Sequence, residues 1–210
     1  MEITSNFGFY AILTNPVIGY GRLTGILVKN NVAFVQLRMK DAPKNDVWRT
    51  ARAMRSITAG SNTKLIINDD PKLAADIGAD GVHLGQNDMG YAEARALVGE
   101  RALIGLSTHN LDQVRAACAL KPDYIGVGPV FATPTKKIAD PVIGLSGMSE
   151  MLRTATVPAV AIGGINLENL DRVVKSGAKN FSLVRPLNET KNPEAVLKQI
   201  LECYRVATGG

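Results

Sequence analysis

Short apolar runs alternate along the chain with longer amphipathic stretches. The runs are rich in Val, Ile and Leu and mostly continuous, and they lie at 9–14, 33–38, 64–69, 81–85, 102–107, 124–129, 158–163 and 180–185. Continuous apolar runs of this length are typical of strands that are buried on both faces, as in a parallel sheet. The pattern therefore predicts eight buried parallel strands.

Helix-like segments separate these runs, for example at 44–58, 89–98, 110–120, 166–176 and 192–206. Short polar side chains stand where helices are expected to begin, because their oxygens can accept hydrogen bonds from the first backbone N–H groups. The residues expected to cap helices in this way are Asp70, Asn110, Asn166 and Asn192. Trp48, near the start of the helix at 44–58, is expected to pack inward.

About eight strand–helix units fit in the 210 residues, with no linker between them. An open doubly wound sheet usually has a G-x-G-x-x-G motif after its first strand, and the segment FYAILTNPVIGYG (9–21) has none. We therefore predict an α/β fold in which residues 1–210 form a single compact (βα)8 TIM barrel.

Polar residues gather after the runs, where the carboxyl ends of barrel strands form the active site. In FVQLRMK (34–40), Gln36, Arg38 and Lys40 share one face of a strand, because alternate side chains point the same way. The other strand-end candidates are Asn68, Asp69, Asp88, Ser107, Thr133, Thr135, Lys136, Gly164, Val184 and Arg185.

These residue types suit two anionic groups and one hard cation. Asp69 and Asp88 follow adjacent strands, and Mg²⁺ is commonly held by one or two carboxylates together with substrate phosphate. Arg38, Lys40 and Lys136 would hold a diphosphate together with the metal. The Gly163–Gly164 pair would let backbone N–H groups approach a second phosphate. The pattern predicts transfer of a group from a diphosphate to a phosphorylated acceptor.

The composition argues against several other classes of protein. The net charge is +5, but the basic residues are scattered and aromatic residues make up only 5% of the chain, so we expect no nucleic-acid partner. No run of about 18 apolar residues occurs, and the two cysteines form no CxxC motif. We expect a cytoplasmic protein with no membrane partner; its oligomeric state is left open, a homo-oligomer included.

Taken together, the motifs resemble those of the thiamine phosphate synthase family. The segments that carry the resemblance are QLRMK (36–40), NDD (68–70), GVHLGQND (81–88), LST (106–108), GPVFATPTKK (128–137) and AIGGI (161–165). The resemblance implies condensation of 4-amino-2-methyl-5-hydroxymethylpyrimidine diphosphate with a thiazole phosphate. It also implies Mg²⁺ as cofactor and a dissociative mechanism that releases pyrophosphate.

The resemblance assigns a role to each matching residue. The pyrimidine diphosphate would be bound by Gln36, Arg38, Lys40, Asn68, Ser107 and Lys136, of which Arg38, Lys40, Ser107 and Lys136 would be catalytic; Asp69 and Asp88 would hold Mg²⁺; and Thr133, Thr135, Gly164, Val184 and Arg185 would bind the thiazole phosphate. The family usually has a small residue at position 185, so the arginine is a departure.

Other readings stay open at this point. A thiazole tautomerase of the same fold would isomerise the thiazole phosphate without Mg²⁺ or the pyrimidine. A non-catalytic ligand-binding regulator is the second alternative, and Arg185 is the feature that favours it. Ser107 has no evident His–Asp pair in the sequence, which argues against a nucleophilic triad, and His83 is expected to be a hydrogen-bonded structural residue within its strand.

Overall fold

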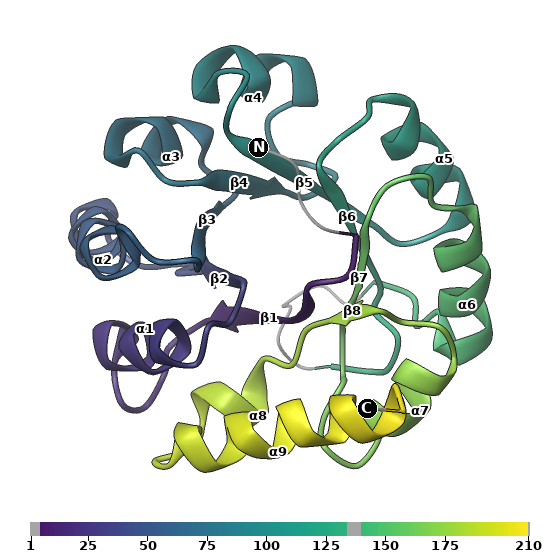
Figure 1. Ribbon diagram of the computed structural model, residues 1–210. Helices are drawn as coiled ribbons and strands as arrows, with labels where there is room; N and C mark the ends of the chain where they lie inside the picture. Colours follow the sequence, from purple (N-terminus) through teal and green to yellow (C-terminus); the bar gives the residue numbers. More distant parts are fainter. Residues whose placement is uncertain (1–4, 134–139, 210) are drawn as a thin grey trace.

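Eight parallel strands close into a barrel with helices around it (Figure 1). The computed structural model describes residues 5–133 and 140–209. The strands are β1 (Gly8–Leu13), β2 (Phe34–Leu37), β3 (Lys64–Asn68), β4 (Gly81–Leu84), β5 (Leu103–Thr108), β6 (Tyr124–Val127), β7 (Ala159–Ala161) and β8 (Asn180–Phe181). Each strand pairs in parallel with its neighbours in the chain, and β8 pairs with β1, so the predicted (βα)8 barrel is confirmed.

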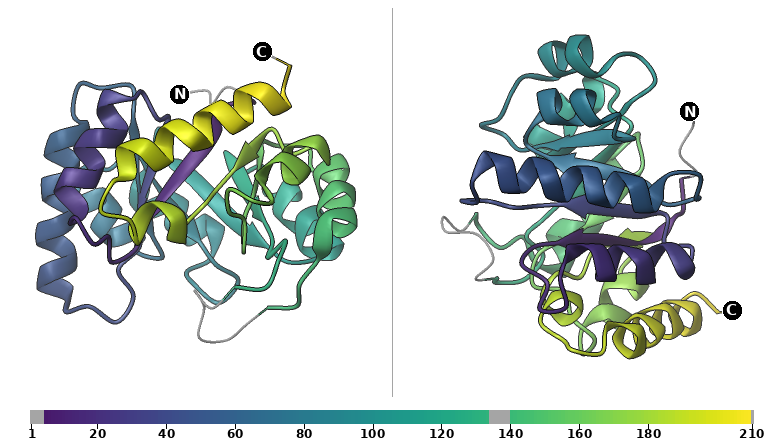
Figure 2. Two further views of the ribbon diagram at one scale, coloured as in Figure 1. Left: turned by 90° about the horizontal axis from the view of Figure 1, so that it is seen from below. Right: turned by 90° about the vertical axis from the view of Figure 1, so that its left-hand side faces the viewer.

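The helices form the outer ring. They are α1 (Tyr20–Lys29), α2 (Lys44–Thr58), α3 (Pro71–Ile77), α4 (Tyr91–Val98), α5 (Leu111–Ala119), α6 (Gly144–Thr154), α7 (Leu170–Lys175), α8 (Arg185–Asn188) and α9 (Pro193–Ala207). The last of them, α9, packs against α7, α8 and α1 and crosses β1, as Figure 2 shows. No helix in the described part of the chain is long and apolar enough to cross a membrane.

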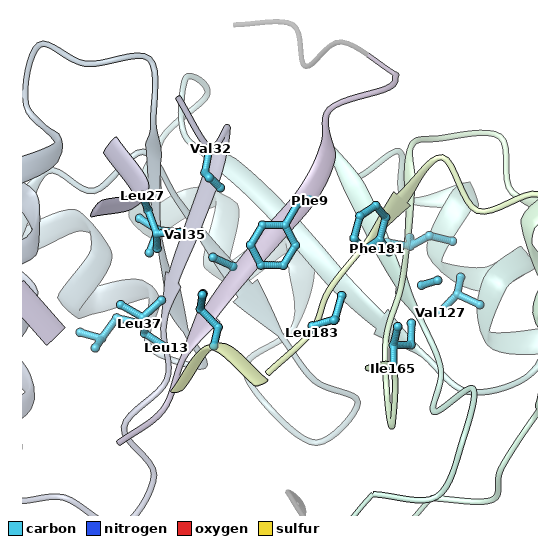
Figure 3. Packing of buried hydrophobic residues seen from close by; sticks show 14 of the residues in the cluster. Phe9, Leu13, Leu27, Val32, Val35, Leu37, Val127, Ile165, Phe181 and Leu183 are labelled. Carbon is cyan, nitrogen blue, oxygen red and sulfur yellow. The ribbon is translucent and has the colours of Figure 1, made fainter. Parts of the chain in front are cut away.

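Alternate side chains of each strand enter two separate packing layers. Phe9 and Leu13 of β1 and Val35 and Leu37 of β2 face outward and pack between the barrel and the helices, together with Leu27 of α1 (Figure 3). The intervening positions face the barrel interior, where a smaller apolar cluster of Tyr10, Ile12, Phe34, Ile66, Leu103, Tyr124 and Val160 fills the space. The strands are therefore buried on both faces, which explains their continuous apolar runs.

The eighth strand is much shorter than predicted. The expected strand at 180–185 ends at Phe181, because Val184 already has helical dihedral angles and Arg185 begins α8. Pro186 suits the first turn of a helix, since that turn does not need its missing N–H. Only two residues of β8 are thus left to pair with β1.

Two buried asparagines supply further links across this closure. The side chain of Asn180 accepts hydrogen bonds from the backbone N–H groups of Phe7 and Gly8 and donates to the carbonyls of Ser5 and Ala159. The side chain of Asn188 in α8 donates to the carbonyl of Ile12 at 2.8 Å and accepts from the N–H of Thr14 at 2.9 Å. Side-chain amides therefore replace ladder hydrogen bonds between the two ends of the chain.

Three of the four predicted helix caps are confirmed. The side chains of Asp70, Asn110 and Asn192 accept hydrogen bonds from Leu73, Gln113 and Ala195 N–H groups. The fourth prediction is wrong, because α7 begins at Leu170 and has Asn169 at its N-cap position. Asn166 instead accepts from the N–H groups of Glu168 and Asn169, which forms a turn before the helix.

The expectation for Trp48 is also wrong. Its side chain is 42% exposed on α2, and the guanidinium of Arg52 lies 4.8 Å from the centre of its ring. The helix buries Ala51, Met54 and Thr58 instead, so the indole lies outside the face that packs on the barrel. A cation–π contact at the surface accounts for its position.

We expect Asn180→Ala to lower the free energy of unfolding by about 2–4 kcal/mol, because it leaves buried backbone groups without hydrogen-bond partners. Urea denaturation followed by circular dichroism measures this loss. Asn6→Ala, at an exposed position nearby, is the control and should change stability by no more than about 0.5 kcal/mol. Equal stability of the two variants would contradict the closing role of Asn180.

Candidate active site

A cavity of about 180 Å³ extends from the barrel interior to the carboxyl ends of the strands. Its wall combines apolar residues of the interior, such as Ile12 and Val160, with polar side chains that follow the strands. Five of the predicted site residues line it: Gln36, Arg38, Ser107, Thr133 and Val184. The end of the barrel that the sequence indicates therefore contains a cavity.

The other predicted residues lie outside this wall or outside the described residues. Among the residues that the structure describes, Lys40, Asn68, Asp69, Asp88, Gly164 and Arg185 do not line the cavity. Arg185 is exposed at the first position of α8. Thr135 and Lys136 fall outside the described residues, so their predicted roles stay predictions.

A group of charged side chains lies at the ends of β2, β3 and β4. The ammonium of Lys40 is 3.1 Å from a carboxylate oxygen of Asp69, and Asp69 also acts electrostatically on Arg38. Asp69 has a left-handed backbone with φ 66°, a conformation that short polar residues tolerate better than most. The carboxylate of Asp88 accepts a hydrogen bond of 2.7 Å from the backbone N–H of Gly85.

The carboxylates of Asp69 and Asp88 are neighbours. The pKa of Asp88 is raised, first by burial and then by hydrogen bonding and charge repulsion with Asp69, while the N–H of Gly85 and the charge of Lys40 act the other way. A raised carboxyl pKa means that the folded protein holds this proton more tightly than the unfolded chain. The Asp88 carboxylate therefore lowers stability as pH rises from the usual aspartate pKa through the raised one.

These carboxylates fit a divalent cation. Two adjacent carboxylates that repel each other are stabilised when a hard cation binds between them. Within residues 5–133 and 140–209, no group of three or more His, Cys, Asp or Glu side chains gathers, so any such cation would need oxygen ligands beyond these side chains. A phosphate group of a substrate is the kind of ligand that Mg²⁺ takes in this situation.

Arg38 is held in the cavity wall at a cost in solvation. Burial lowers the pKa of its guanidinium, while the carboxylates of Asp69 and Asp41 and the nearby Tyr20 raise it. A partly buried guanidinium beside a cavity is a strong site for an anion, because it offers several donors in a fixed plane.

A buried hydrogen-bonded chain lies beneath the polar rim. Gln36 is 2% exposed, and its amide nitrogen donates to the hydroxyl of Tyr10 at 2.9 Å. That hydroxyl is 2.8 Å from the hydroxyl of Tyr124, which in turn lies 3.1 Å from Nδ1 of His83. Nε2 of His83 is 2.9 Å from the hydroxyl of Ser107. His83 in β4 is therefore hydrogen-bonded, as predicted, and its partners belong to β6 and β5.

The sequence interpretation missed Tyr10 and Tyr124, and it missed that Ser107 has a histidine partner. The partner of His83 Nδ1 is a phenol here, which differs from the carboxylate of a Ser–His–Asp triad. Both tyrosines stand in apolar runs and look like core residues. The available signal was a glycine within the apolar run of β5, Gly105, because a strand glycine often marks a place where a large side chain approaches the backbone closely.

Gly105 makes room for the ring of Tyr124. A Cβ atom at position 105 would lie 2.1 Å from Cζ and 2.5 Å from the hydroxyl oxygen of that ring. At Gly126 a Cβ atom would meet the ring of His83 at 3.5 Å, which is ordinary contact. The strand glycine at 105 is thus required by close packing, whereas the one at 126 is tolerant of a methyl group.

The Gly163–Gly164 pair follows β7 at the rim. Both glycines have left-handed backbones, with φ 96° and 65°, and a Cβ atom at position 164 would lie 2.6 Å from Cβ of Phe131. The carbonyl of Gly163 accepts from the N–H of Phe131 at 2.9 Å, so this turn packs directly on the loop after β6. Only glycine fits such a close approach of two backbones.

A model of the family described as thiamine monophosphate synthase matches residues 21–187. The chain belongs to this family. A thiamine-phosphate synthase of Syntrophomonas wolfei is 35% identical over 205 residues, which cover 96% of this chain and 98% of the relative. A thiamine-phosphate synthase of Gloeobacter violaceus is 44% identical over 168 residues, which cover 80% of this chain and 49% of the relative.

The chain thus spans about half the length of the Gloeobacter relative and of a Synechocystis one, which it covers to 55%. Among solved structures, a thiamine phosphate pyrophosphorylase from Pyrococcus furiosus superposes with a TM-score of 0.87 at 25% identity and covers 98% of this chain and 99% of that one. The predicted membership in the thiamine monophosphate synthase family is confirmed. The roles of individual residues stay predictions.

In this member of the thiamine monophosphate synthase family, we expect Gly105→Ala to lower the free energy of unfolding by about 1–3 kcal/mol or more, because the added methyl group displaces the Tyr124 ring. Chemical denaturation measures the change. Gly25→Ala is the matched control, since Gly25 lies within α1 and its Cβ atom would meet nothing within 4 Å. It should stabilise the protein by up to about 1 kcal/mol. A change of the same sign in both variants would contradict this packing.

Proposed function

We propose that the protein is a thiamine-phosphate synthase, a transferase that joins the pyrimidinylmethyl group of 4-amino-2-methyl-5-hydroxymethylpyrimidine diphosphate to a thiazole phosphate. The observation that carries the proposal is the group of Arg38, Lys40, Asp69 and Asp88 beside a cavity whose wall includes Gln36 and Ser107. Family membership supports it, since relatives that match nearly the whole chain have this name.

The diphosphate would lie against the charged group. Arg38 offers a planar set of donors from the cavity wall, and Lys40 offers a mobile charge that now contacts Asp69 at 3.1 Å. Asn68 precedes Asp69 in the chain, and Lys136 is assigned to the same substrate from its motif. Together these donors would hold the two phosphate groups and leave the pyrimidine ring in the cavity between Gln36 and Ser107.

Asp69 and Asp88 would hold Mg²⁺. The pKa of Asp88 is raised first by burial and then by the adjacent Asp69, and the closeness of the two carboxylates supports this assignment. Bound there, the ion would neutralise part of the negative charge of the diphosphate.

The chemistry needs stabilised negative charge more than proton transfer. The C–O bond to the diphosphate breaks with both electrons going to oxygen, which gives a pyrimidinylmethyl cation and pyrophosphate. The lone pair of the thiazole nitrogen then forms the new C–N bond. Arg38, Lys40 and Lys136 would stabilise the charge that develops on the leaving group, and removal of one such contact typically slows a reaction by on the order of 10²–10³-fold.

The thiazole phosphate would lie on the opposite side of the cavity. Thr133 and Val184 line the cavity wall, and Gly164, whose backbone is left-handed, would bring the backbone of the rim close to the phosphate. Thr135 is assigned to this site from its motif. Arg185 follows Val184 and is exposed, so its guanidinium would reach the phosphate only from the solvent side.

The test is incubation with both substrates and Mg²⁺, with thiamine phosphate detected by mass or by fluorescence after oxidation. Formation of thiamine phosphate supports the proposal. Tight binding of a substrate with no product would favour the non-catalytic regulator. Proton exchange on the thiazole phosphate without Mg²⁺ or pyrimidine would favour the tautomerase.

We expect Asp69→Ala to lower the rate of pyrophosphate release by on the order of 10²–10³-fold, because the variant loses a carboxylate proposed to bind the metal and the ion-pair partner of Lys40. Lys136→Ala should have an effect of similar size. A coupled pyrophosphate assay measures both. Asp76→Ala, at an exposed position of α3, is the control and should leave the rate unchanged. Near-normal turnover of the Asp69 variant would refute its role.

Arg185→Ser should mainly change the KM for the thiazole phosphate, since residue 185 is assigned to that substrate and the family usually has a small residue there. Steady-state kinetics with each substrate varied in turn measures this. Arg205→Ser removes an arginine that pairs with Glu202 on α9 and should leave both KM values unchanged. An effect confined to the pyrimidine substrate would contradict the placement of residue 185.

A further inference from the structure

Five side chains from five different strands form one hydrogen-bonded chain across the barrel interior. They are Gln36 of β2, Tyr10 of β1, Tyr124 of β6, His83 of β4 and Ser107 of β5, and every link is between 2.8 and 3.1 Å. All five residues line the cavity. The order of donors and acceptors along this chain decides which hydrogen-bonding group the cavity offers to a ligand.

Both tyrosines of the hydrogen-bonded chain, Tyr10 and Tyr124, are neutral. Burial raises the pKa of Tyr10 and of Tyr124 above the usual tyrosine range, and in each case it is the largest cause. A neutral phenol has one hydrogen to donate and an oxygen that can accept. Each tyrosine can therefore pass the direction of hydrogen bonding from one neighbour to the next.

The amide of Gln36 sets this direction. Its nitrogen donates to the hydroxyl oxygen of Tyr10, so the hydrogen of Tyr10 is left to point at its second partner, the oxygen of Tyr124. In the reverse order the oxygen of Tyr10 would receive hydrogens from both neighbours. Its own hydrogen would then have no acceptor among the partners recorded for it in the described part of the chain. Buried hydroxyl groups left in that state are costly.

The direction then passes through the imidazole. With the hydrogen of Tyr10 directed at the oxygen of Tyr124, the hydrogen of Tyr124 is left for Nδ1 of His83, 3.1 Å away. Nδ1 then acts as the acceptor, which places the single proton of a neutral imidazole on Nε2. Nε2–H donates to the oxygen of Ser107, 2.9 Å away. The hydrogen of the Ser107 hydroxyl is then available to the cavity, and Ser107 presents a donor there.

We propose that Gln36, Tyr10 and Tyr124 are positioning residues that keep His83 as its neutral Nε2–H tautomer and thereby make the Ser107 hydroxyl a hydrogen-bond donor to the pyrimidine substrate. The second part rests on the proposed function. An aminopyrimidine diphosphate carries acceptors for this donor on both its ring nitrogens and its phosphate oxygens. The cavity thus selects a ligand with an acceptor at Ser107.

Nitrogen NMR of the free protein tests the tautomer directly. The protein has only two histidines, His83 and His109. The signals that remain in the His109→Gln variant therefore belong to His83. In long-range ¹H–¹⁵N spectra at pH 7, we expect His83 to show a protonated Nε2 and an unprotonated Nδ1. A proton on Nδ1, or on both nitrogens, would overturn the proposal.

Removal of one hydroxyl from the chain tests the positioning role. Tyr124→Phe should give a mixture of His83 tautomers and raise the KM for the pyrimidine diphosphate by about tenfold, the size of one lost hydrogen bond, with the KM for the thiazole phosphate changed less than about twofold. A merely structural role would affect both substrates alike and leave the tautomer unchanged, and either result would count against the inference.

Tyr204→Phe is the matched control, because the Tyr204 hydroxyl donates to the carbonyl of Lys179 and takes no part in the chain. It should leave the tautomer and both KM values unchanged. If Tyr124→Phe does not fold, Tyr10→Phe interrupts the same chain one link earlier and should give the same mixture of tautomers.

The two proposals fail separately. The tautomer is measured without substrate, so absence of thiamine phosphate formation refutes the enzymatic function and leaves the assignment of His83 standing. Formation of thiamine phosphate by a protein with the proton on Nδ1 refutes only the direction of the hydrogen-bonded chain.

Discussion

In a closed barrel every second side chain of each strand points inward, and these side chains must fill an interior of fixed width. The packing of the core and the cavity wall both depend on this constraint. The interior is filled by large residues such as Tyr10, Phe34 and Tyr124, and glycine at position 105 leaves the space that the Tyr124 ring occupies. The phenol groups that result are buried, and they satisfy each other and their polar neighbours by hydrogen bonding. The same two tyrosines therefore fill the core and orient the polar side chains of the cavity wall.

The rim depends on a second balance, between charges of opposite sign. Lys40 pairs with Asp69, while Asp69 and Asp88 repel each other and Arg38 loses solvation in the cavity wall. A divalent cation would reduce the repulsion between the two carboxylates, and an anion would offset the lost solvation of the Arg38 guanidinium. The diphosphate proposed as substrate carries the negative charge that would complete such a site.

Closure of the ring uses different means from those that pair the other strands. Because β8 contributes only two residues, the amides of Asn180 and Asn188 hold it to β1 and to the start of the chain. The cavity wall includes Val184, which lies between these two asparagines in the sequence. The amide of Asn188 also donates to the carbonyl of Val184 at 2.7 Å, so one side chain contacts both the closure and a residue of the cavity wall.

The sequence by itself determined the eight-stranded barrel, its polar end and the family, because continuous apolar runs, in-phase polar residues and motifs are local properties of the chain. It also placed Gln36, Arg38 and Ser107 at a common site, since all strands of a parallel barrel end at the same rim. Only the tertiary structure decided the contact between Tyr10 and Tyr124, which are 114 residues apart, and the histidine partner of Ser107. It also decided that β8 ends at Phe181 and that Arg185 is exposed. Local sequence patterns indicate which side chains are buried and whether a segment is helix or strand. Hydrogen-bond partners and strand ends depend on which distant residues the closed barrel brings together.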